Sequence, residues 1–181
     1  MRFDNNEFER RVLAHETWIK PQVGWVKLNS DGSVLGNLKK ARGGAVLKCI
    51  DGDWISGCLR KLGNTSCTLA KLWSLRDGLL LAKQLSLENI CVDMDAKFLV
   101  YLLSNSFVVN LSLEPLLSDY RNLMKTFLNC TVVHVCREVN RCAARLATLE
   151  VDLHSDHLIL YRRWWKICLL VIKLAMFVTD L

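Results

Sequence analysis

The sequence lacks the cysteine patterns that bind zinc. It contains 8 cysteines, yet no two of them form a C-x-x-C pair. Cys130, Cys136 and Cys142 recur every six residues, a spacing that fits no zinc template. Most of the cysteines lie in apolar runs such as residues 129–136 (NCTVVHVC). We therefore interpret them as buried, reduced thiols.

The sequence also lacks a secretory signal and an apolar run long enough to span a bilayer. Residues 1–11 (MRFDNNEFERR) are polar and charged, so we expect an intracellular protein of the nucleus or cytoplasm, not a secreted one. The most apolar run, residues 164–178 (WWKICLLVIKLAMFV), contains Lys166 and Lys173. It is shorter than the roughly 20 residues that a spanning helix needs. We expect an amphipathic or core-docking tail; a membrane anchor is the alternative.

Two common catalytic motifs are missing as well. No glycine-rich phosphate loop follows a strand, and no nucleophile elbow with a central serine occurs. What the chain has is 181 residues with 51% hydrophobic and 23% charged side chains, which indicates one folded domain with appendages. The net charge of +6 favours an anionic partner, most commonly nucleic acid, although many basic proteins bind none.

The apolar spacing predicts a mixed sheet with helices on its faces. An alternating pattern predicts strands, and apolar positions three and four apart predict helices. The expected strands are residues 25–30, 43–50, 54–62, 89–95 and 130–138, and the expected helices are 66–85, 96–104, 112–128 and 140–150. Gly52 suits a hairpin turn, Ser66 a helix N-cap and Pro115 the first turn of a helix. The first three strands should form an antiparallel meander.

Two carboxylates follow strands of this predicted sheet. Asp31 ends the first strand at the turn Asp31-Gly32-Ser33, and Asp95 ends the strand at 89–95. Strand ends near a switch in strand order are where open sheets bind ligands, and paired carboxylates there are suited to Mg²⁺. Asp93 shares a strand face with Asp95 and could support it. The alternative is that Asp31 caps a turn and Asp95 caps the helix that starts at Ala96.

Several runs resemble a known family. They are residues 24–33 (GWVKLNSDGS), 41–57 (ARGGAVLKCIDGDWISG), 69–82 (LAKLWSLRDGLLLA), 90–100 (ICVDMDAKFLV) and 132–147 (VVHVCREVNRCAARLA). Together they resemble a ribonuclease H domain, and more narrowly the plant ribonuclease H-like domains related to non-LTR retrotransposon reverse transcriptases. The resemblance implies an α/β ribonuclease H-like fold with a five-stranded mixed sheet flanked by helices. It also implies metal-dependent endonucleolytic hydrolysis of the RNA strand of an RNA–DNA hybrid.

The family places four acids in its active site, and this chain matches two of them. Asp31 and Asp95 stand where the family has its first and third acids. Lys71, in AKLWSL, stands where the family has a glutamate on the first helix, and Ala144, in REVNRCAARLA, stands where it has an acid on the last. We hypothesise that Lys71 acts as a fixed surrogate cation, so that Mg²⁺ or Mn²⁺ is a cofactor only if activity survives. The alternative is that Lys71 extends to solvent and the two aspartates hold one weakly bound ion.

Basic residues indicate where nucleic acid would bind. The stretch 37–44 (NLKKARGG) places three of them in the predicted loop between the first two strands: Lys39, Lys40 and Arg42. Arg137 and Asn140 match the R-E-x-N run of the family, and His134 matches its V-x-H run. Ordinary interpretations remain for each: a solvated loop, a cap and a core histidine.

The sequence thus predicts three parts: a lead-in (1–20), a ribonuclease H-like domain (21–150) and a divergent apolar tail (151–181). The expected function is that of a nucleic-acid-binding ribonuclease H-like protein, with an RNA–DNA hybrid or duplex as partner and hydrolysis weakened or lost. The alternatives are a catalytically inactive binding module, a retrotransposon relic, or an interaction protein that uses its tail.

Overall fold

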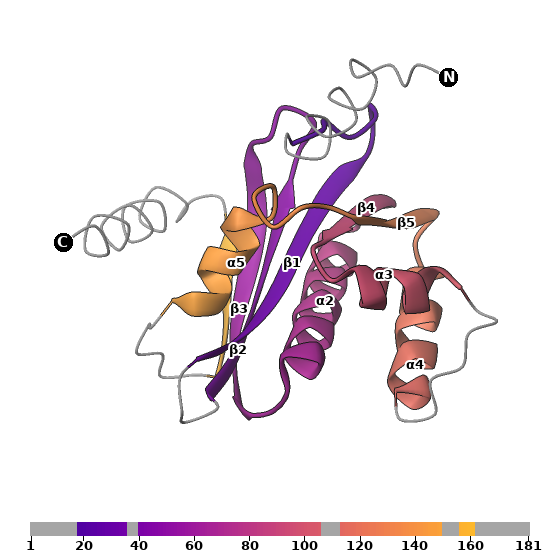
Figure 1. The fold of residues 1–181 in the computed structure, drawn as a ribbon. Coiled ribbons are helices and arrows are strands. Elements are labelled where there is room, and N and C mark those ends of the chain that lie inside the picture. Colours follow the sequence, from indigo (N-terminus) through magenta and orange to yellow (C-terminus); the bar gives the residue numbers. More distant parts are fainter. Residues whose placement is uncertain (1–17, 36–39, 106–112, 150–155, 162–181) are drawn as a thin grey trace, which may run out of the picture.

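The computed structural model describes residues 18–35, 40–105, 113–149 and 156–161. They form one six-stranded sheet with helices packed on it (Figure 1). The elements are β1 (Val26–Leu35), β2 (Lys40–Lys48), β3 (Trp54–Asn64), α2 (Cys67–Gln84), β4 (Asn89–Met94), α3 (Lys97–Ser104), α4 (Glu114–Met124), β5 (Asn129–His134), α5 (Arg141–Thr148) and β6 (His157–Tyr161). Most of the predicted lead-in, Lys39 and the apolar run 164–178 lie outside the described residues.

The sheet is mixed, as predicted, and its strand order is β5-β4-β1-β2-β3-β6. Strands β1, β2 and β3 form the predicted antiparallel meander, whereas β4 is parallel to β1 and β5 is parallel to β4. The predicted count of five strands is wrong by one. The sixth strand, β6, comes from the segment predicted as a tail and pairs with β3. It joins the sheet because Leu160 is buried in a small cluster with Val46, Trp54 and Leu146.

The first strand is longer than predicted. It does not end at Ser30 but continues to Leu35, and Asp31 is paired with Gly44 of β2 in the antiparallel register. The predicted turn at Asp31 is therefore absent, because the β1–β2 hydrogen-bond ladder overrides the local turn preference of the Asp-Gly-Ser sequence. For the same reason Lys40 and Arg42 lie in β2, not in a loop.

The predictions for Ser66, Pro115 and Gly52 are confirmed. The hydroxyl of Ser66 accepts a hydrogen bond from the backbone N–H of Leu69 at 3.2 Å, so Ser66 is the N-cap of α2. Pro115 lies in the first turn of α4, and Gly52 has a φ of 83° in the β2–β3 turn. Within the described ranges no helix is long and apolar enough to cross a membrane.

Helices α2 and α5 cover opposite faces of the sheet. Neighbouring residues of a strand point to opposite faces. Accordingly, Gly43 of β2 faces Ser74 of α2, and the next residue, Gly44, faces Leu146 of α5. The main core fills the α2 side, where apolar residues of the sheet pack against α2, α3 and α4. Its largest fully buried side chains include Leu28, Leu47, Leu72, Leu75, Leu79, Ile90, Met94, Leu99, Leu102 and Leu117.

The cysteines are less uniformly buried than predicted. All seven within the described residues are free thiols. Cys58 is buried, and burial raises its pKa to about 12. Cys67 and Cys142 are exposed, because each lies in the first turns of a helix on its solvent side.

Candidate functional site

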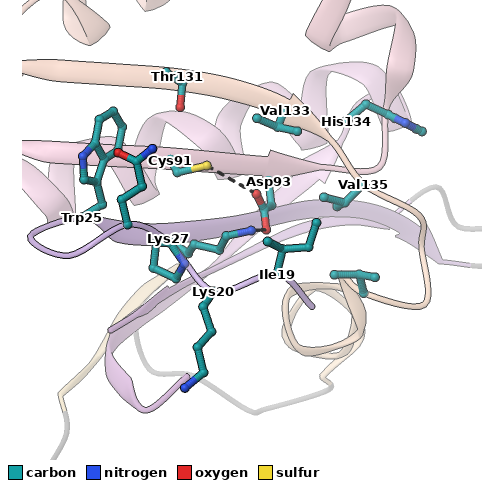
Figure 2. Close-up of a pocket in the computed structure, with 13 residues that line it drawn as sticks. Ile19, Lys20, Trp25, Lys27, Cys91, Asp93, Thr131, Val133, His134 and Val135 are labelled. Carbon is teal, nitrogen blue, oxygen red and sulfur yellow. Dashed lines mark hydrogen bonds and ion pairs between the residues drawn. The ribbon is translucent and has the colours of Figure 1, made fainter. Parts of the chain in front are cut away.

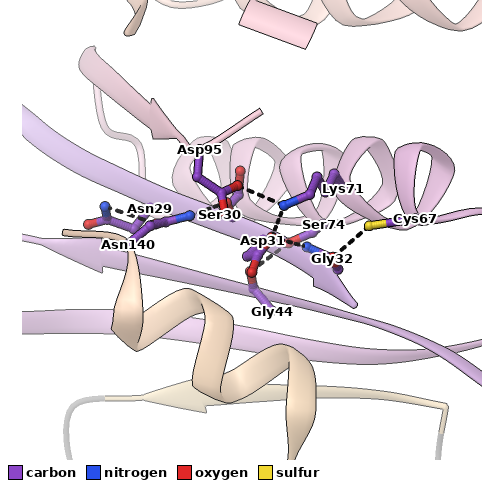
Figure 3. Close-up of polar contacts among 10 residues, drawn as sticks. All are labelled: Asn29, Ser30, Asp31, Gly32, Gly44, Cys67, Lys71, Ser74, Asp95 and Asn140. Carbon is purple, nitrogen blue, oxygen red and sulfur yellow. Dashed lines mark hydrogen bonds and ion pairs between the residues drawn. The ribbon is translucent and has the colours of Figure 1, made fainter. Parts of the chain in front are cut away.

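Asp31 and Asp95 lie close together, with Lys71 between them (Figure 3). The parallel pairing of β1 with β4 brings the two carboxylates next to each other, near the end of β4. Lys71 projects from α2. Its ammonium group donates one hydrogen bond to Oδ1 of Asp31 and another to Oδ1 of Asp95, the latter at 2.7 Å. One cation therefore bridges the two acids that the sequence singled out.

The position of Lys71 depends on Gly32. A Cβ atom at Gly32 would lie 2.2 Å from the backbone carbonyl carbon of Ala70 and from the backbone nitrogen of Lys71. Helix α2 thus packs directly on the backbone of β1, which is possible only without a side chain. The backbone N–H of Gly32 also donates to Oδ1 of Asp31 at 2.8 Å and fixes the orientation of that carboxylate. Gly32 is therefore part of the site, because it admits α2 and orients the carboxylate of Asp31.

The three charged side chains are shielded from solvent: the exposed fraction is 16% for Lys71, 5% for Asp31 and 11% for Asp95. Burial raises the pKa of Asp31 above its ordinary value, and the hydrogen bond and charge of Lys71 oppose that shift. Burial alone would lower the pKa of Lys71, but the hydrogen bonds and charges of Asp31 and Asp95 outweigh it and raise the pKa. Lys71 is accordingly a cation at neutral pH.

The donor set does not fit the divalent metal ions that the family resemblance implies. The ammonium of Lys71 fills the space between the carboxylate oxygens that would have to ligate a metal. Ala144 reaches the same pocket from α5 but offers no ligand atom. In the described part of the chain, no three His, Cys, Asp or Glu side chains are grouped so that they could hold a metal ion. The capping alternative for Asp95 is wrong too, because α3 begins at Lys97 and has no side-chain cap.

Asp93 does not support Asp95, contrary to the prediction. It is fully buried in a different pocket of about 360 Å³, where the ammonium of Lys27 donates to its Oδ2 at 2.7 Å (Figure 2). Strand β4 ends at Met94, so Asp95 no longer follows the alternation that the prediction assumed. His134 lines this other pocket and is not at the Asp31–Asp95 site.

Helix α5 closes the site from the other face of the sheet. A Cβ atom at Gly44 would lie 2.6 Å from the Cβ of Leu146 and 2.7 Å from the backbone nitrogen of Ala147, so α5 packs directly on β2. Asn140, which was predicted to contact nucleic acid, is fully buried. Its amide donates to the carbonyl of Ser30 at 2.9 Å, as Figure 3 shows, and so holds the start of α5 against β1. The structure gives Asn140 a positioning role.

The pocket over Asp31, Lys71 and Asp95 has a volume of about 470 Å³ and is also lined by arginines. Arg137 was predicted to bind nucleic acid, and it lies there, exposed. Arg141 and Arg145 lie there too, and sequence reasoning missed both. Their spacing of four residues was the available signal, because residues four apart share one face of a helix.

A second basic pocket, of about 540 Å³, lies at the β2–β3 end of the sheet. Lys40, Arg42 and Lys61 line it together with Asp156. The guanidinium of Arg42 donates to the carbonyl of Leu149 at 3.2 Å, at the end of α5. The two basic pockets therefore adjoin each other, since Thr148, the preceding residue, lines the first.

Comparison with known sequences decides the family. The sequence model of the family described as reverse transcriptase-like matches residues 29–150. An Arabidopsis thaliana protein that is named as a ribonuclease H protein is 32% identical over 153 residues, which cover 82% of this chain. The chain belongs to the reverse transcriptase-like family, as a plant-type ribonuclease H-like domain. This chain spans only about a quarter of the length of the Arabidopsis relative.

Solved structures share the fold of this ribonuclease H-like domain. Ribonuclease H1 from Halobacterium salinarum is 25% identical, with a TM-score of 0.64, and the match covers 68% of this chain and 94% of that one. The N-terminal ribonuclease H domain of a Mycobacterium tuberculosis protein is 28% identical, with a TM-score of 0.63 and coverage of 68% and 90%. LC11 ribonuclease H1, solved in complex with an RNA/DNA hybrid, has a TM-score of 0.60 at 21% identity, with coverage of 67% and 92%. The ribonuclease H-like fold predicted from the sequence is confirmed.

Proposed function

We propose that this ribonuclease H-like domain binds RNA–DNA hybrid or duplex nucleic acid and has lost efficient metal-dependent hydrolysis. The observation that carries the proposal is the ammonium of Lys71, which donates to both Asp31 and Asp95. Those are the two acids of the family site that remain. The positive charge of Lys71 takes the place that a metal ion would need between these two acids.

Electrostatics oppose a divalent ion at this position. An approaching Mg²⁺ meets a part-buried ammonium a few ångströms away, and one oxygen of each carboxylate already accepts a hydrogen bond from Lys71. Ala144 supplies no further ligand. Even the loss of outer-shell partners of a metal site costs about 10–100-fold in affinity or activity, and here two ligand positions are replaced.

The basic surface supports the binding part of the proposal. Two adjoining pockets are lined by three basic side chains each, apart from Lys71: Arg137, Arg141 and Arg145 in the first, and Lys40, Arg42 and Lys61 in the second. Contacts between basic side chains and phosphate groups supply most of the sequence-independent affinity for nucleic acid. A foamy viral protease-reverse transcriptase with the same fold at a TM-score of 0.57 and LC11 ribonuclease H1 have both been solved with an RNA/DNA hybrid.

A cleavage assay tests the catalytic part of the proposal. The full chain is incubated with a labelled RNA–DNA hybrid in Mg²⁺ or Mn²⁺, and we expect no cleavage above background. The double variant Lys71→Glu with Ala144→Asp restores both acids, and we expect it to cleave the hybrid, with each single variant well below it. Cleavage by the unaltered protein at a rate equal to that of the double variant would contradict the proposal.

A control separates removal of the ammonium from restoration of a ligand. Lys71→Gln removes the charge but adds no carboxylate, so we expect it to stay inactive. Circular dichroism confirms that each variant is folded before its activity is compared. Calorimetric titration of the unaltered protein with Mn²⁺ is independent of any variant, and tight binding there would also count against the proposal.

A further inference from the structure

The pocket over the degenerate active site carries a positive charge. We call it the arginine pocket and define it by Lys71, Arg137, Arg141 and Arg145 together with Asp31 and Asp95. Four cationic and two anionic side chains give it a formal net charge of +2. With acids at positions 71 and 144, as in the family, and the same three arginines, the sum over these positions would be −1, so the sign of the local charge is inverted here. A pocket of this sign attracts anions, where the family site attracts cations.

The two acids of the pocket are already paired. Both accept hydrogen bonds from Lys71. Within the described residues, none of the three guanidinium groups lies within ion-pair distance of a carboxylate. The Nε of Arg145 is buried, and it too has no hydrogen-bond partner among these residues. A buried donor without a partner is costly, so the guanidinium of Arg145 has hydrogen-bonding capacity that this part of the chain does not use.

Two of the three arginines, Arg141 and Arg145, lie on helix α5. Arg141 and Arg145 are one turn apart on α5, and Ala144, the neighbour that an acid occupies in the family, offers no carboxylate to neutralise them. Helix α5 is fixed by its close packing on Gly44 and by the buried amide of Asn140. The backbone that carries Arg141 and Arg145 therefore needs no rearrangement on binding, which favours affinity.

We propose that the arginine pocket binds a phosphate group of nucleic acid directly, without a metal ion. Guanidinium groups match phosphate oxygens with paired, charge-assisted hydrogen bonds. The group bound is either an internal phosphodiester or a terminal phosphate, since both present the same oxygens. This inference rests on the proposed nucleic-acid binding and names the group that the former active site now recognises.

Titration with inorganic phosphate tests the site itself. The full chain is titrated by calorimetry at constant ionic strength against a chloride reference. We expect saturable binding that Arg141→Gln and Arg145→Gln each weaken about tenfold, the usual loss for one charge-assisted hydrogen bond. Arg76→Gln is the matched control, because Arg76 is exposed on α2 and lines another pocket. Absence of saturable binding, or an equal loss in the Arg76 variant, would overturn the inference.

Thiol protection gives a second measurement that needs no variant. Cys67 lines the same pocket, whereas Cys142 is exposed near Lys48 and does not line it. Neutral N-ethylmaleimide modifies both in the folded protein, and peptide mass spectrometry reports each rate. We expect phosphate to slow modification of Cys67 and to leave Cys142 unchanged. If Cys67 is modified at the same rate with and without phosphate, that result would count against phosphate binding in the arginine pocket.

Hybrid oligonucleotides distinguish the two sources of phosphate. Tighter binding of a hybrid with a 5′-phosphate than of one without it identifies a terminal phosphate as the ligand. Equal affinity with protection of Cys67 identifies an internal phosphodiester. Hybrid binding without protection of Cys67 overturns this inference and leaves the proposed function standing. Hybrid cleavage by the unaltered protein at the rate of the double variant overturns the catalytic part of the proposed function, while the phosphate titration still decides this inference.

Discussion

At the scale of single residues, one ammonium group determines the chemistry of the site. Lys71 lies in the position from which the family extends a glutamate, and it satisfies the two carboxylates that remain. A buried acid is expensive unless a cation accompanies it. In the family that cation is a divalent metal, whereas here it is covalently part of the chain. We therefore expect the stability of the fold to be independent of metal concentration.

Removing Lys71 should make the stability of the protein depend on metal. Lys71→Met leaves Asp31 and Asp95 buried without their cation, so we expect the free energy of unfolding to fall by about 3 kcal/mol in metal-free buffer. Millimolar Mg²⁺ should recover part of that loss in the variant and should not stabilise the unaltered protein. Urea unfolding with and without Mg²⁺ measures both effects.

Lys83→Met is the control for this experiment. Lys83 lies in the last turn of the same helix, is exposed and pairs with no carboxylate in the described part of the chain, so the change should stay within about 0.5 kcal/mol. Mg²⁺ that stabilised the unaltered protein as much as the Lys71 variant would show that the ammonium does not replace a metal ion.

The site residues that carry a family motif could be found from sequence, and those that depend on packing could not. Asp31, Lys71, Asp95 and Ala144 were identified from motifs, and the structure brings all four to one pocket. Arg145 was missed, because whether a surface arginine of α5 turns toward the site is set by how that helix packs, and packing depends on distant residues.

At the scale of elements, two glycines bring two helices onto the sheet at the site. Gly32 admits α2 on one face and Gly44 admits α5 on the other. Helix α2 carries Lys71, and helix α5 carries Arg141 and Arg145. Close backbone approach therefore determines the geometry of the pocket as much as its charged side chains do.

A methyl group at Gly44 should displace α5. In Gly44→Ala the new Cβ would meet the Cβ of Leu146 and the backbone of Ala147 at under 3.0 Å, so the helix must move. We expect a loss of about 1–3 kcal/mol in the free energy of unfolding, as for other overpacked sites. Phosphate and hybrid affinity should also fall, because the arginines move with the helix.

Gly43→Ala is the matched control. Its Cβ would face the other helix and would meet the side chain of Ser74 at 3.1 Å, a contact that a small shift relieves. Urea unfolding and phosphate titration of the two variants give the comparison. A Gly43 variant as impaired as the Gly44 variant would show that the approach of α5 is not what builds the pocket.

Elements were predictable where their signals are local. Helix α2 followed from its apolar spacing and from the cap at Ser66. The extension of β1 beyond Ser30 and the pairing of β6 with β3 did not follow, since both depend on hydrogen bonds to distant strands. The short β6 is stabilised by burial of Leu160 against the β2–β3–α5 cluster, a contact far away in sequence.

At the scale of the whole molecule, basic side chains of the described residues line two pockets, one of them over Asp31, Lys71 and Asp95. The chain has a net charge of +6. The arginine pocket and its neighbour at the β2–β3 end meet through the contact of Arg42 with the carbonyl of Leu149. A duplex lying along both would meet basic side chains from α5 to β2. Affinity on such a surface comes from displaced counterions and so depends on salt.

Six basic side chains besides Lys71 line these two pockets, and their number sets the expected salt dependence. If each meets one phosphate, the logarithm of hybrid affinity should fall with the logarithm of salt at a slope of about −5. Between 50 and 200 mM salt the affinity should then drop by about 10³-fold, measured by fluorescence anisotropy with a labelled hybrid. The double variant Arg141→Gln with Arg145→Gln should reduce the slope by about 2, whereas Arg76→Gln should leave it unchanged. Chelation of divalent ions with EDTA should alter neither curve, because the cations that meet the phosphates belong to the protein. A flat salt profile, or loss of binding in EDTA, would mean that the domain holds nucleic acid by other contacts or through a metal ion after all.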